Sequence, residues 1–447
     1  MTQRLGHLFR LRPGETGLVL TLGFLLFANS VAQPLAEITA ISNFLLEVGV
    51  NNILLVWIVD ALLAFLLTGG QSLLIDRFDR RRLLLGFCAL LSAVFGLLWL
   101  MVVLGAPSWL NYGLLYLVAQ QQWLVFPMVF WVLSNDVLDM SQAKRLFPLM
   151  ASLGFVGRLA GILLALVWPG MMARLGMPAQ TVLLLSILIY VVAFLVAFYG
   201  LRRIKVRQTT YRVETVQETL AEGWAFVREV PLFRFLALVT LALIVCETFL
   251  EFHFLAVTER TFSTAASYQM FYSLYRLGLT VASIVVQAFL TSRIIGRIGL
   301  KNAFLILPIA ALAGATWMLA SAASIVSVVG GVVLQKLPQF TIDESARKSF
   351  QALVPEERRG RVSVFIDSYV YSAASIIGSL ITGAIVFAGL RLGLPQYYYA
   401  YLAAAVAAAA IGLWAALRLR QVYDSSMLNW RLKRRERRSS VLDKLQF

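Results

Sequence analysis

Charged residues are scarce in this sequence. Of its 447 residues, 14% are charged and 60% are hydrophobic, whereas soluble domains carry about 25% charged and about half apolar residues. This composition excludes an ordinary soluble domain and fits a chain surrounded by lipid, where backbone polar groups must be satisfied inside helices or closed barrels. The apolar runs are long and continuous instead of alternating over about ten residues, so the sequence predicts helices and not a barrel.

Cysteine and histidine are also rare. The two cysteines, Cys88 and Cys246, lie inside apolar runs, which argues against a disulfide or a metal site. With two histidines and no nucleophile–base pattern, we predict that the protein is not an enzyme and binds no metal or cofactor. A GxxxxGK(S/T) run is absent, which excludes a P-loop ATPase. The N-terminal arginines precede an apolar stretch too long for a secretory signal, so we expect no cleavable signal.

Apolar stretches long enough to cross a bilayer are abundant. One crossing needs about 20 predominantly apolar residues. The sequence therefore predicts an all-α integral membrane protein with twelve transmembrane helices. We place them at residues 16–46, 52–75, 83–104, 109–135, 146–168, 179–201, 232–257, 267–290, 302–322, 324–342, 362–388 and 396–418.

The lysines and arginines are distributed unevenly over the loops. Most of the 39 lie at the two chain ends and in the loops that follow even-numbered helices, whereas the opposite loops hold only Arg174, Arg260 and Arg391. Because positively charged loops stay in the cytoplasm, we predict a multi-pass protein of the cell (inner) membrane with cytoplasmic N- and C-termini. The net charge of +16 then reflects orientation, so we expect membrane lipids and no nucleic acid among the partners.

The longest polar stretch between helices separates six predicted helices from six others. We predict an N-terminal six-helix bundle at 1–201, a cytoplasmic linker with an amphipathic helix at 202–231, a C-terminal six-helix bundle at 232–418, and a basic cytoplasmic tail at 419–447. Two pseudo-symmetric six-helix halves are the pattern of the major facilitator fold.

A short motif supports the internal repeat. Residues 72–82 read SLLIDRFDRRR and resemble the loop signature G-x-x-x-D-R-x-G-R-R of the major facilitator superfamily. The matching place in the second half, residues 296–301, reads GRIGLK, a degraded copy. The resemblance implies a conformational gate at one face of the membrane, formed by Asp76, Arg77, Arg80, Arg81 and Arg297.

Several polar and charged residues fall inside the predicted helices, where a charge costs about 2.5–3.5 kcal/mol at the bilayer centre. Asn29, Gln33 and Glu37 recur every four residues and so share one helix face, and Pro34 is expected to bend that helix. We predict that a set of such residues lines a central cavity and binds substrate, with the basic members holding an anion and the acidic members pairing with them or carrying a coupling proton. The alternative is that several are interhelical salt bridges without substrate contact. The set comprises Asn29, Gln33, Glu37, Asp60, Arg158, Glu247, Glu251, Arg276 and Lys336.

Two stretches are more specific. Residues 131–148 read WVLSNDVLDMSQAKRLFP, and residues 344–348 (ESARK) are followed by VPEERRGR at 354–361. Both resemble the ATP/ADP translocase family of bacteria and plastids, a branch of the facilitator superfamily, and Glu251 resembles that family's acidic residue on helix 7. The resemblance implies nucleotide exchange across a membrane, with basic residues holding phosphates. No lysine or arginine occurs from Thr16 to Asn52, where established members have a lysine, so the chain resembles a divergent member.

Three functions remain open from the sequence. The first is a secondary active transporter that works by alternating access on an organic anion such as a nucleotide, with ATP:ADP antiport implied by the resemblance. The second is a proton-coupled facilitator of a lipid or drug-like amphiphile, in which the acidic residues would do the work. The third is a non-transporting membrane sensor or scaffold. In each case we expect a monomer.

Overall fold

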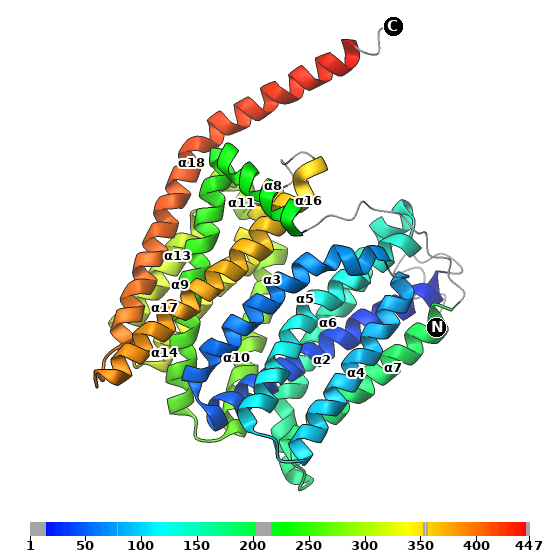
Figure 1. The fold of residues 1–447 in the computed structure, drawn as a ribbon, viewed down its shortest axis with the longest axis vertical. Helices are drawn as coiled ribbons and strands as arrows, with labels where there is room; N and C mark the ends of the chain where they lie inside the picture. Colours follow the sequence, from blue (N-terminus) through cyan, green and yellow to red (C-terminus); the bar gives the residue numbers. More distant parts are fainter. Residues whose placement is uncertain (1–14, 78, 203–215, 352–353, 355, 444–447) are drawn as a thin grey trace. The chain divides into compact units, whose positions relative to one another are not determined.

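The computed structural model describes residues 15–77, 79–202, 216–351, 354 and 356–443, and these residues are predominantly helical (Figure 1). Within this described part, twelve helices are long and apolar enough to cross a membrane. They coincide with the twelve predicted stretches, so the prediction of an all-α protein with twelve transmembrane helices is confirmed. The chain divides into two compact units, Met1–Thr215 with Thr258–Thr280, and Val216–Val257 with Val281–Phe447.

In the first unit, α2 is the central helix and contacts α5, α6 and α7, while α4 packs on α5 and α7. Of the spans in the N-terminal half, α2 is also the most completely buried. The helices of this half are α2 (Thr16–Val48), α3 (Ile53–Arg77), α4 (Arg80–Val103), α5 (Ser108–Val137), α6 (Met140–Arg174) and α7 (Val182–Gly200), with short 3-10 turns η1 (Val50–Asn52) and η2 (Ala179–Thr181).

Small residues allow α6 to approach α2 closely. A Cβ atom on Gly157 would lie 2.6 Å from the backbone oxygen of Phe27, and one on Gly161 would lie 2.4 Å from that of Val31. Both distances are too short for a real contact, so glycine is required at both places. Close backbone approach through small residues is a usual way to pack membrane helices.

The second unit contains the remaining helices, apart from the end of α9 and most of α10, which belong to the first unit. Its last helix, α18, continues well past the end of α13, so the predicted tail 419–447 is helical as far as Asp443 (Figure 1). The elements from the linker onward are α8 (Val216–Glu229), α9 (Pro231–Thr261), α10 (Ala265–Val285), η3 (Val286–Thr291), α11 (Ser292–Ile298), α12 (Leu300–Ala303), α13 (Ile306–Ala320), α14 (Ile325–Pro338), η4 (Gln339–Asp343), α15 (Glu344–Gln351), α16 (Glu356–Val364), η5 (Phe365–Val370), α17 (Tyr371–Arg391) and α18 (Tyr398–Asp443).

Three long helices of the C-terminal half are interrupted by π-helical turns. The turn η3 joins α10 to α11, η4 joins α14 to α15, and η5 joins α16 to α17. A π turn accommodates an extra residue and rotates the helix faces on its two sides, and such turns are frequent at functional sites. No corresponding interruption occurs in the described helices α2 to α7.

The linker helix α8 packs against the beginning of the α16–η5–α17 helix. Glu222 pairs with Arg361, and its Oε1 atom lies 3.2 Å from Nε of Arg358. One residue on, a Cβ atom at Gly223 would lie 2.5 Å from Cβ of Phe365. The amphipathic linker helix therefore lies directly on the η5 turn.

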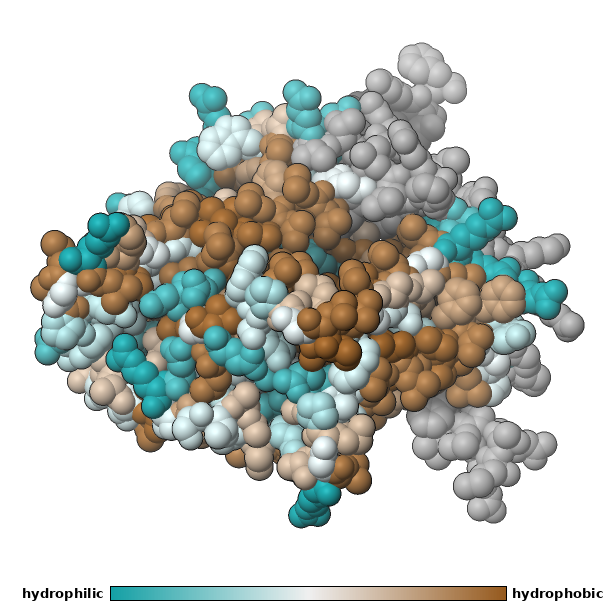
Figure 2. Space-filling view, turned by 60° about the horizontal axis from the view of Figure 1, so that its bottom comes forward, coloured by the Kyte–Doolittle hydropathy of each residue, from teal (hydrophilic) through white to brown (hydrophobic). Residues whose placement is uncertain are grey.

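The surface of the helices is largely apolar. The space-filling view shows broad hydrophobic areas with hydrophilic residues in separate groups (Figure 2). On α3, for example, Leu55 and Leu66 expose 67% and 65% of their surface. Such a surface suits a lipid environment, because apolar side chains face the lipid and the backbone polar groups are satisfied within each helix.

Candidate transport site

A buried ion pair joins α2 and α10 in the first unit. The Nη2 atom of Arg276 lies 2.7 Å from Oε2 of Glu37, and their side chains are 13% and 7% exposed. Gln33 lies one turn before Glu37 and donates from Nε2 both to Oε2 of Glu37 (3.1 Å) and to the backbone oxygen of Ala119 (3.4 Å). Three predicted substrate residues, Gln33, Glu37 and Arg276, are therefore in direct contact.

Arg158 on α6 belongs to the same neighbourhood. It interacts electrostatically with Glu37 and Arg276, and its guanidinium carbon lies 4.8 Å from the ring centre of Trp123. Among the described residues no carboxylate lies within ion-pairing distance of Arg158, and its buried Nε atom has no hydrogen-bond partner. The guanidinium is thus held by an aromatic face and keeps unused donors.

Asp60 on α3 has a neutral partner. Gln121 on α5 donates from Nε2 to its Oδ1 atom at 2.7 Å, and Asp60 also feels the charge of Glu37. Neighbouring residues of the glutamine run at 120–122 therefore have different partners, because Gln122, the next residue, donates to the hydroxyl of Tyr190. The predicted residues Glu37, Asp60, Arg158 and Arg276 together bring two carboxyl groups and two guanidinium groups into this neighbourhood.

Asn29 is placed apart from this cluster. Its Oδ1 atom accepts a hydrogen bond of 2.9 Å from the hydroxyl of Tyr190, which in turn accepts one from Gln122. All three side chains are at most 2% exposed, and they tie α2 to α5 and α7. The structure thus places Asn29 in a helix-packing network, two turns from Glu37.

A second cluster lies between α9 and α14 in the second unit. The Nζ atom of Lys336 lies 3.0 Å from Oε1 of Glu247 and 2.7 Å from Oε2 of Glu251. Gln339, the first residue of η4, donates to the other oxygen of Glu247 at 2.8 Å. Lys336 also lies 6.0 Å from the ring centre of Phe340. The structure thus brings the predicted residues Glu247, Glu251 and Lys336 together, although Lys336 follows Glu247 by 89 positions in the sequence.

The predicted gate residues have separate places. Arg80 forms a buried salt bridge with Asp136 of α5, and Arg81 donates to the backbone oxygen of Arg202 at 3.2 Å. Asp79 stands where the family signature has glycine, and it caps α4 by accepting from the backbone N–H of Arg81 at 2.9 Å. Arg297 lies exposed on α11. The side chains of Asp76 and Arg77 lie outside the described residues.

Sequence reasoning missed the ion network at the end of α15. Asp367 in η5 accepts from Nη1 of Arg347 at 3.2 Å and from Nζ of Lys348 at 2.7 Å, and Arg347 also reaches Asp343 at 3.4 Å. Both carboxylates of this network lie in π turns, which shift the helix register. The signal available in the sequence was the ESARK motif, whose Arg347 and Lys348 supply the cations.

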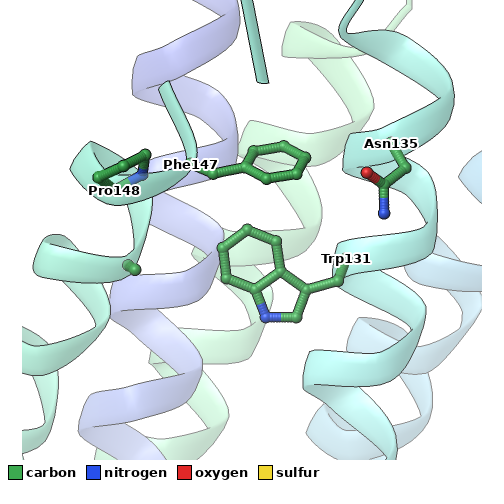
Figure 3. Close-up of a pocket in the computed structure, with 5 residues that line it drawn as sticks. Trp131, Asn135, Phe147 and Pro148 are labelled. Atoms are coloured by element: carbon green, nitrogen blue, oxygen red, sulfur yellow. The ribbon is translucent and has the colours of Figure 1, made fainter. Parts of the chain in front are cut away.

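The 131–148 motif builds the turn between α5 and α6. Asp139 caps α6 and forms a capping box with Gln142. A hollow of about 440 Å³ lies beside this turn, lined by Trp131, Asn135, Phe147, Pro148 and Ala151. Figure 3 shows the rings of Trp131 and Phe147 next to each other in its wall, in edge-on contact with ring centres 5.2 Å apart. Its lining is apolar apart from Asn135 and includes none of the predicted substrate residues.

Comparison with solved structures shows the same fold. A mutant of the nucleoside transporter NupG superposes with a TM-score of 0.66 at 13% identity, covering 90% of this chain and 99% of that one. A bacterial homologue of the iron transporter ferroportin in an inward-facing state gives 0.62 at 15% identity, with coverage of 92% and 99%. The POT family transporter PepTSo gives 0.61 at 12% identity, with coverage of 91% and 98%.

Twelve helices long and apolar enough to cross a membrane, arranged in this fold, define a protein of the major facilitator fold. The family profile described as TLC ATP/ADP transporter matches residues 89–329. The chain belongs to this family, and the predicted recognition and the assignment as a multi-pass membrane transporter are confirmed. A search among proteins of curated function gave no match.

Proposed function

We propose that this protein carries a nucleotide-like organic anion across the membrane by alternating access, with Arg158 as its principal anion-binding group. The observation that supports this is the state of Arg158: a guanidinium inside a membrane helix, stacked 4.8 Å from Trp123 and without a carboxylate partner among the described residues. A charge in the membrane interior is expensive unless it is paired. An anionic substrate supplies the missing partner.

The second arginine gives the site its selectivity for multiply charged anions. Arg276 is 2.7 Å from Glu37 in this structure, and a phosphate that binds Arg158 competes for it. Guanidinium groups bind phosphate oxygens through two parallel hydrogen bonds. Trp123 exposes half of its surface and offers an aromatic face for a planar base. Asn29, Gln33 and Asp60 are proposed to complete the site by polar contacts or by fixing its shape.

Access alternates, in this proposal, by movement of the half 1–201 against the half 232–418. Segment 258–280 belongs to the C-terminal half by sequence and to the first compact unit by contacts. It is held there by Arg276 on Glu37, by Gln269 on the backbone oxygen of Ala165 at 3.0 Å, and by Glu259 on the backbone N–H of Val50 at 3.2 Å. These are the links that must break when access changes. The salt bridge of Arg80 with Asp136 is proposed as part of the gate at the other end.

The orientation follows from the loop charges. We infer that both termini lie in the cytoplasm and that the host membrane is the cell (inner) membrane, since Arg81, Arg145 and Arg297 mark one face and the opposite loops are poor in cations. The protein works as a monomer in this scheme, because each half supplies residues to the transport path. Membrane lipids cover its apolar surface.

A thermal-shift screen of the detergent-solubilised protein tests the proposal. The panel contains ATP, ADP, other phosphorylated metabolites and simple organic anions, and each is tried on the native chain and on Arg158→Ala. A ligand present at 100 times its Kd stabilises the native state by about 2.7 kcal/mol. We expect ATP or ADP to raise the melting temperature of the native chain and to lose this effect in Arg158→Ala.

The matched control is Arg174→Ala. This substitution removes the same charge from the same helix, at a residue that is exposed and lies about 24 Å further along α6 at 1.5 Å per residue. The variant should respond to nucleotides as the native chain does. Absence of a response to every anion, together with stabilisation by lipids or hydrophobic amines, would reject the anion proposal and favour the amphiphile facilitator.

A further inference from the structure

The cluster between α9 and α14 contains one more negative charge than positive charge. Two carboxylates, Glu247 and Glu251, share the single ammonium of Lys336 at 3.0 and 2.7 Å. We propose that this cluster is a proton site, in which Glu251 takes up and releases the proton that accompanies the anionic substrate. The inference rests on the proposed function and names the coupling ion for it.

The cluster is partly buried, with Glu251 as its most exposed member. The side chains of Glu247 and Lys336 are each 9% exposed, and the shell around them includes Phe340 and the apolar faces of α9 and α14. Opposite charges in such surroundings must be matched, because an uncompensated buried charge is strongly unfavourable. One added proton makes the cluster neutral.

A metal ion does not fit this arrangement. The position between the two carboxylates that a cation would take is filled by the Lys336 ammonium, which contacts one oxygen of each. A second cation there would lie within a few ångströms of the first. Among the described residues no group of three or more acidic, histidine or cysteine side chains is placed to hold a metal. The missing positive charge is therefore best supplied as a covalently bound proton.

The two carboxylates differ in their remaining bonds. Glu247 accepts from Lys336 on one oxygen and from Gln339 on the other, so its ionised form is fully satisfied. Glu251 accepts from Lys336 on Oε2, while no described donor reaches its Oε1 atom, and its side chain is 25% exposed. A proton from water can form the O–H bond at Oε1 of Glu251, leaving Lys336 paired with Glu247.

Neighbouring titratable groups are already engaged. The thiol of Cys246 faces Gln335 at 3.8 Å, and both ring nitrogens of His253 are bonded, to the hydroxyl of Tyr401 at 2.9 Å and to the backbone oxygen of Ala322 at 2.8 Å. Further along α14 and α15, Asp343, Arg347, Lys348 and Asp367 form the separate network described above, with Glu344 exposed beside it. Between Tyr371 and Arg391, α17 carries no ionisable side chain, and neither does α13.

The charge of the cluster has a consequence for the direction in which protons and the anion move. An ionised Glu251 leaves a net negative cluster, whereas a protonated Glu251 leaves a neutral one. We expect proton binding to Glu251 to favour anion binding, and anion binding must then favour proton binding to the same extent, because linked equilibria are reciprocal. Uptake of the anion should be accompanied by protons moving in the same direction.

Proteoliposomes loaded with a pH-sensitive dye test this, with ADP as the probe. We expect an external acid step to increase ADP uptake several-fold and ADP to acidify the lumen. Glu251→Gln should lose both responses, and Glu251→Asp should restore them in part. Glu344→Gln, which removes an exposed carboxylate of α15, should behave as the native chain.

The failures are distinguishable. ADP uptake by the native chain that ignores the pH gradient, or that requires sodium instead, overturns the proton site and leaves the anion transporter standing. Unchanged gradient dependence in Glu251→Gln also overturns it. Lack of ADP binding in the thermal-shift screen is a failure of the proposed function itself. The dye measurement on the native chain decides the matter even where a variant does not fold.

Discussion

The ion pair between Glu37 and Arg276 is the contact in the first unit whose loss should have the clearest consequence. It lies inside the membrane region and holds α10 to α2 through atoms 2.7 Å apart. Replacing one partner by glutamine, as in Glu37→Gln, removes the carboxylate charge that faces Arg276. We expect this variant to release the 258–280 segment before it unfolds.

The size of the effect follows from burial. Removal of one member of a buried pair costs about 3–5 kcal/mol. The lower end applies here, because Arg276 is 13% exposed and keeps the ring of Tyr272, whose centre lies 6.0 Å away. If the conformation in which α10 is held to α2 loses about 3 kcal/mol, its equilibrium with the released conformation shifts by more than about a hundredfold, since 1.4 kcal/mol is tenfold. The double variant with Arg276→Gln should recover most of it, because both charges are then gone.

Accessibility of a buried position on α10 measures the release. Ser273 is fully buried, so Ser273→Cys in a chain whose Cys88 and Cys246 are replaced by serine gives a single reporter for a membrane-impermeant maleimide. Labelling should be at least tenfold faster with Glu37→Gln. The matched control is Asp424→Asn, which breaks the exposed pair with Lys301 and should leave the rate unchanged, because exposed pairs contribute little. Equal labelling rates with and without Glu37, or a double variant as fast as the single one, would refute the view that the Glu37–Arg276 pair holds the 258–280 segment in place.

Two further predictions concern packing. Gly157→Ala places a methyl group against the backbone oxygen of Phe27 and should lower the free energy of unfolding by about 1–3 kcal/mol, measured by thermal or denaturant unfolding; Gly170→Ala, which has open space around it, should have no such effect. Glu222→Gln removes the partner of two arginines on α16, so proteolysis in the 202–231 linker should become faster, whereas Glu229→Gln, at the exposed last residue of α8, should leave the cleavage rate as it is.

The helices could be predicted because each obeys a local rule. About 20 apolar residues give one crossing, and the charges that end each stretch are visible in the sequence. The π turns were not predictable in this way, because the composition of residues 339–343 and 365–370 does not mark them off from the helices on either side. Their effect is large, since the turn η4 places Gln339 against Glu247 and η5 holds Asp367 near Arg347.

The candidate site was predictable as a set of residues and not as a set of contacts. The spacing of Gln33 and Glu37 correctly puts them on one face of α2, where they touch. The same spacing includes Asn29, whose partner is Tyr190 of α7, and no local pattern distinguishes it. Pairing depends on residues far apart in the chain, such as Glu37 with Arg276, separated by 239 positions. Sequence periodicity fixes a direction on one helix, while the partner is decided by tertiary packing.

The two charge clusters differ in their balance of charge, and this difference bears on the absence of a lysine from α2. In the first unit, Glu37 pairs with Arg276, while no carboxylate of the described residues lies within ion-pairing distance of Arg158. In our proposal, an anion supplies the partner that Arg158 lacks and also competes with Glu37 for Arg276. Binding and release of the 258–280 segment are then one event. The negative excess lies instead with Glu247 and Glu251, where a proton can cancel it. Under this proposal no lysine on α2 is needed to hold the anion, because α10 would supply the second cation when the substrate binds.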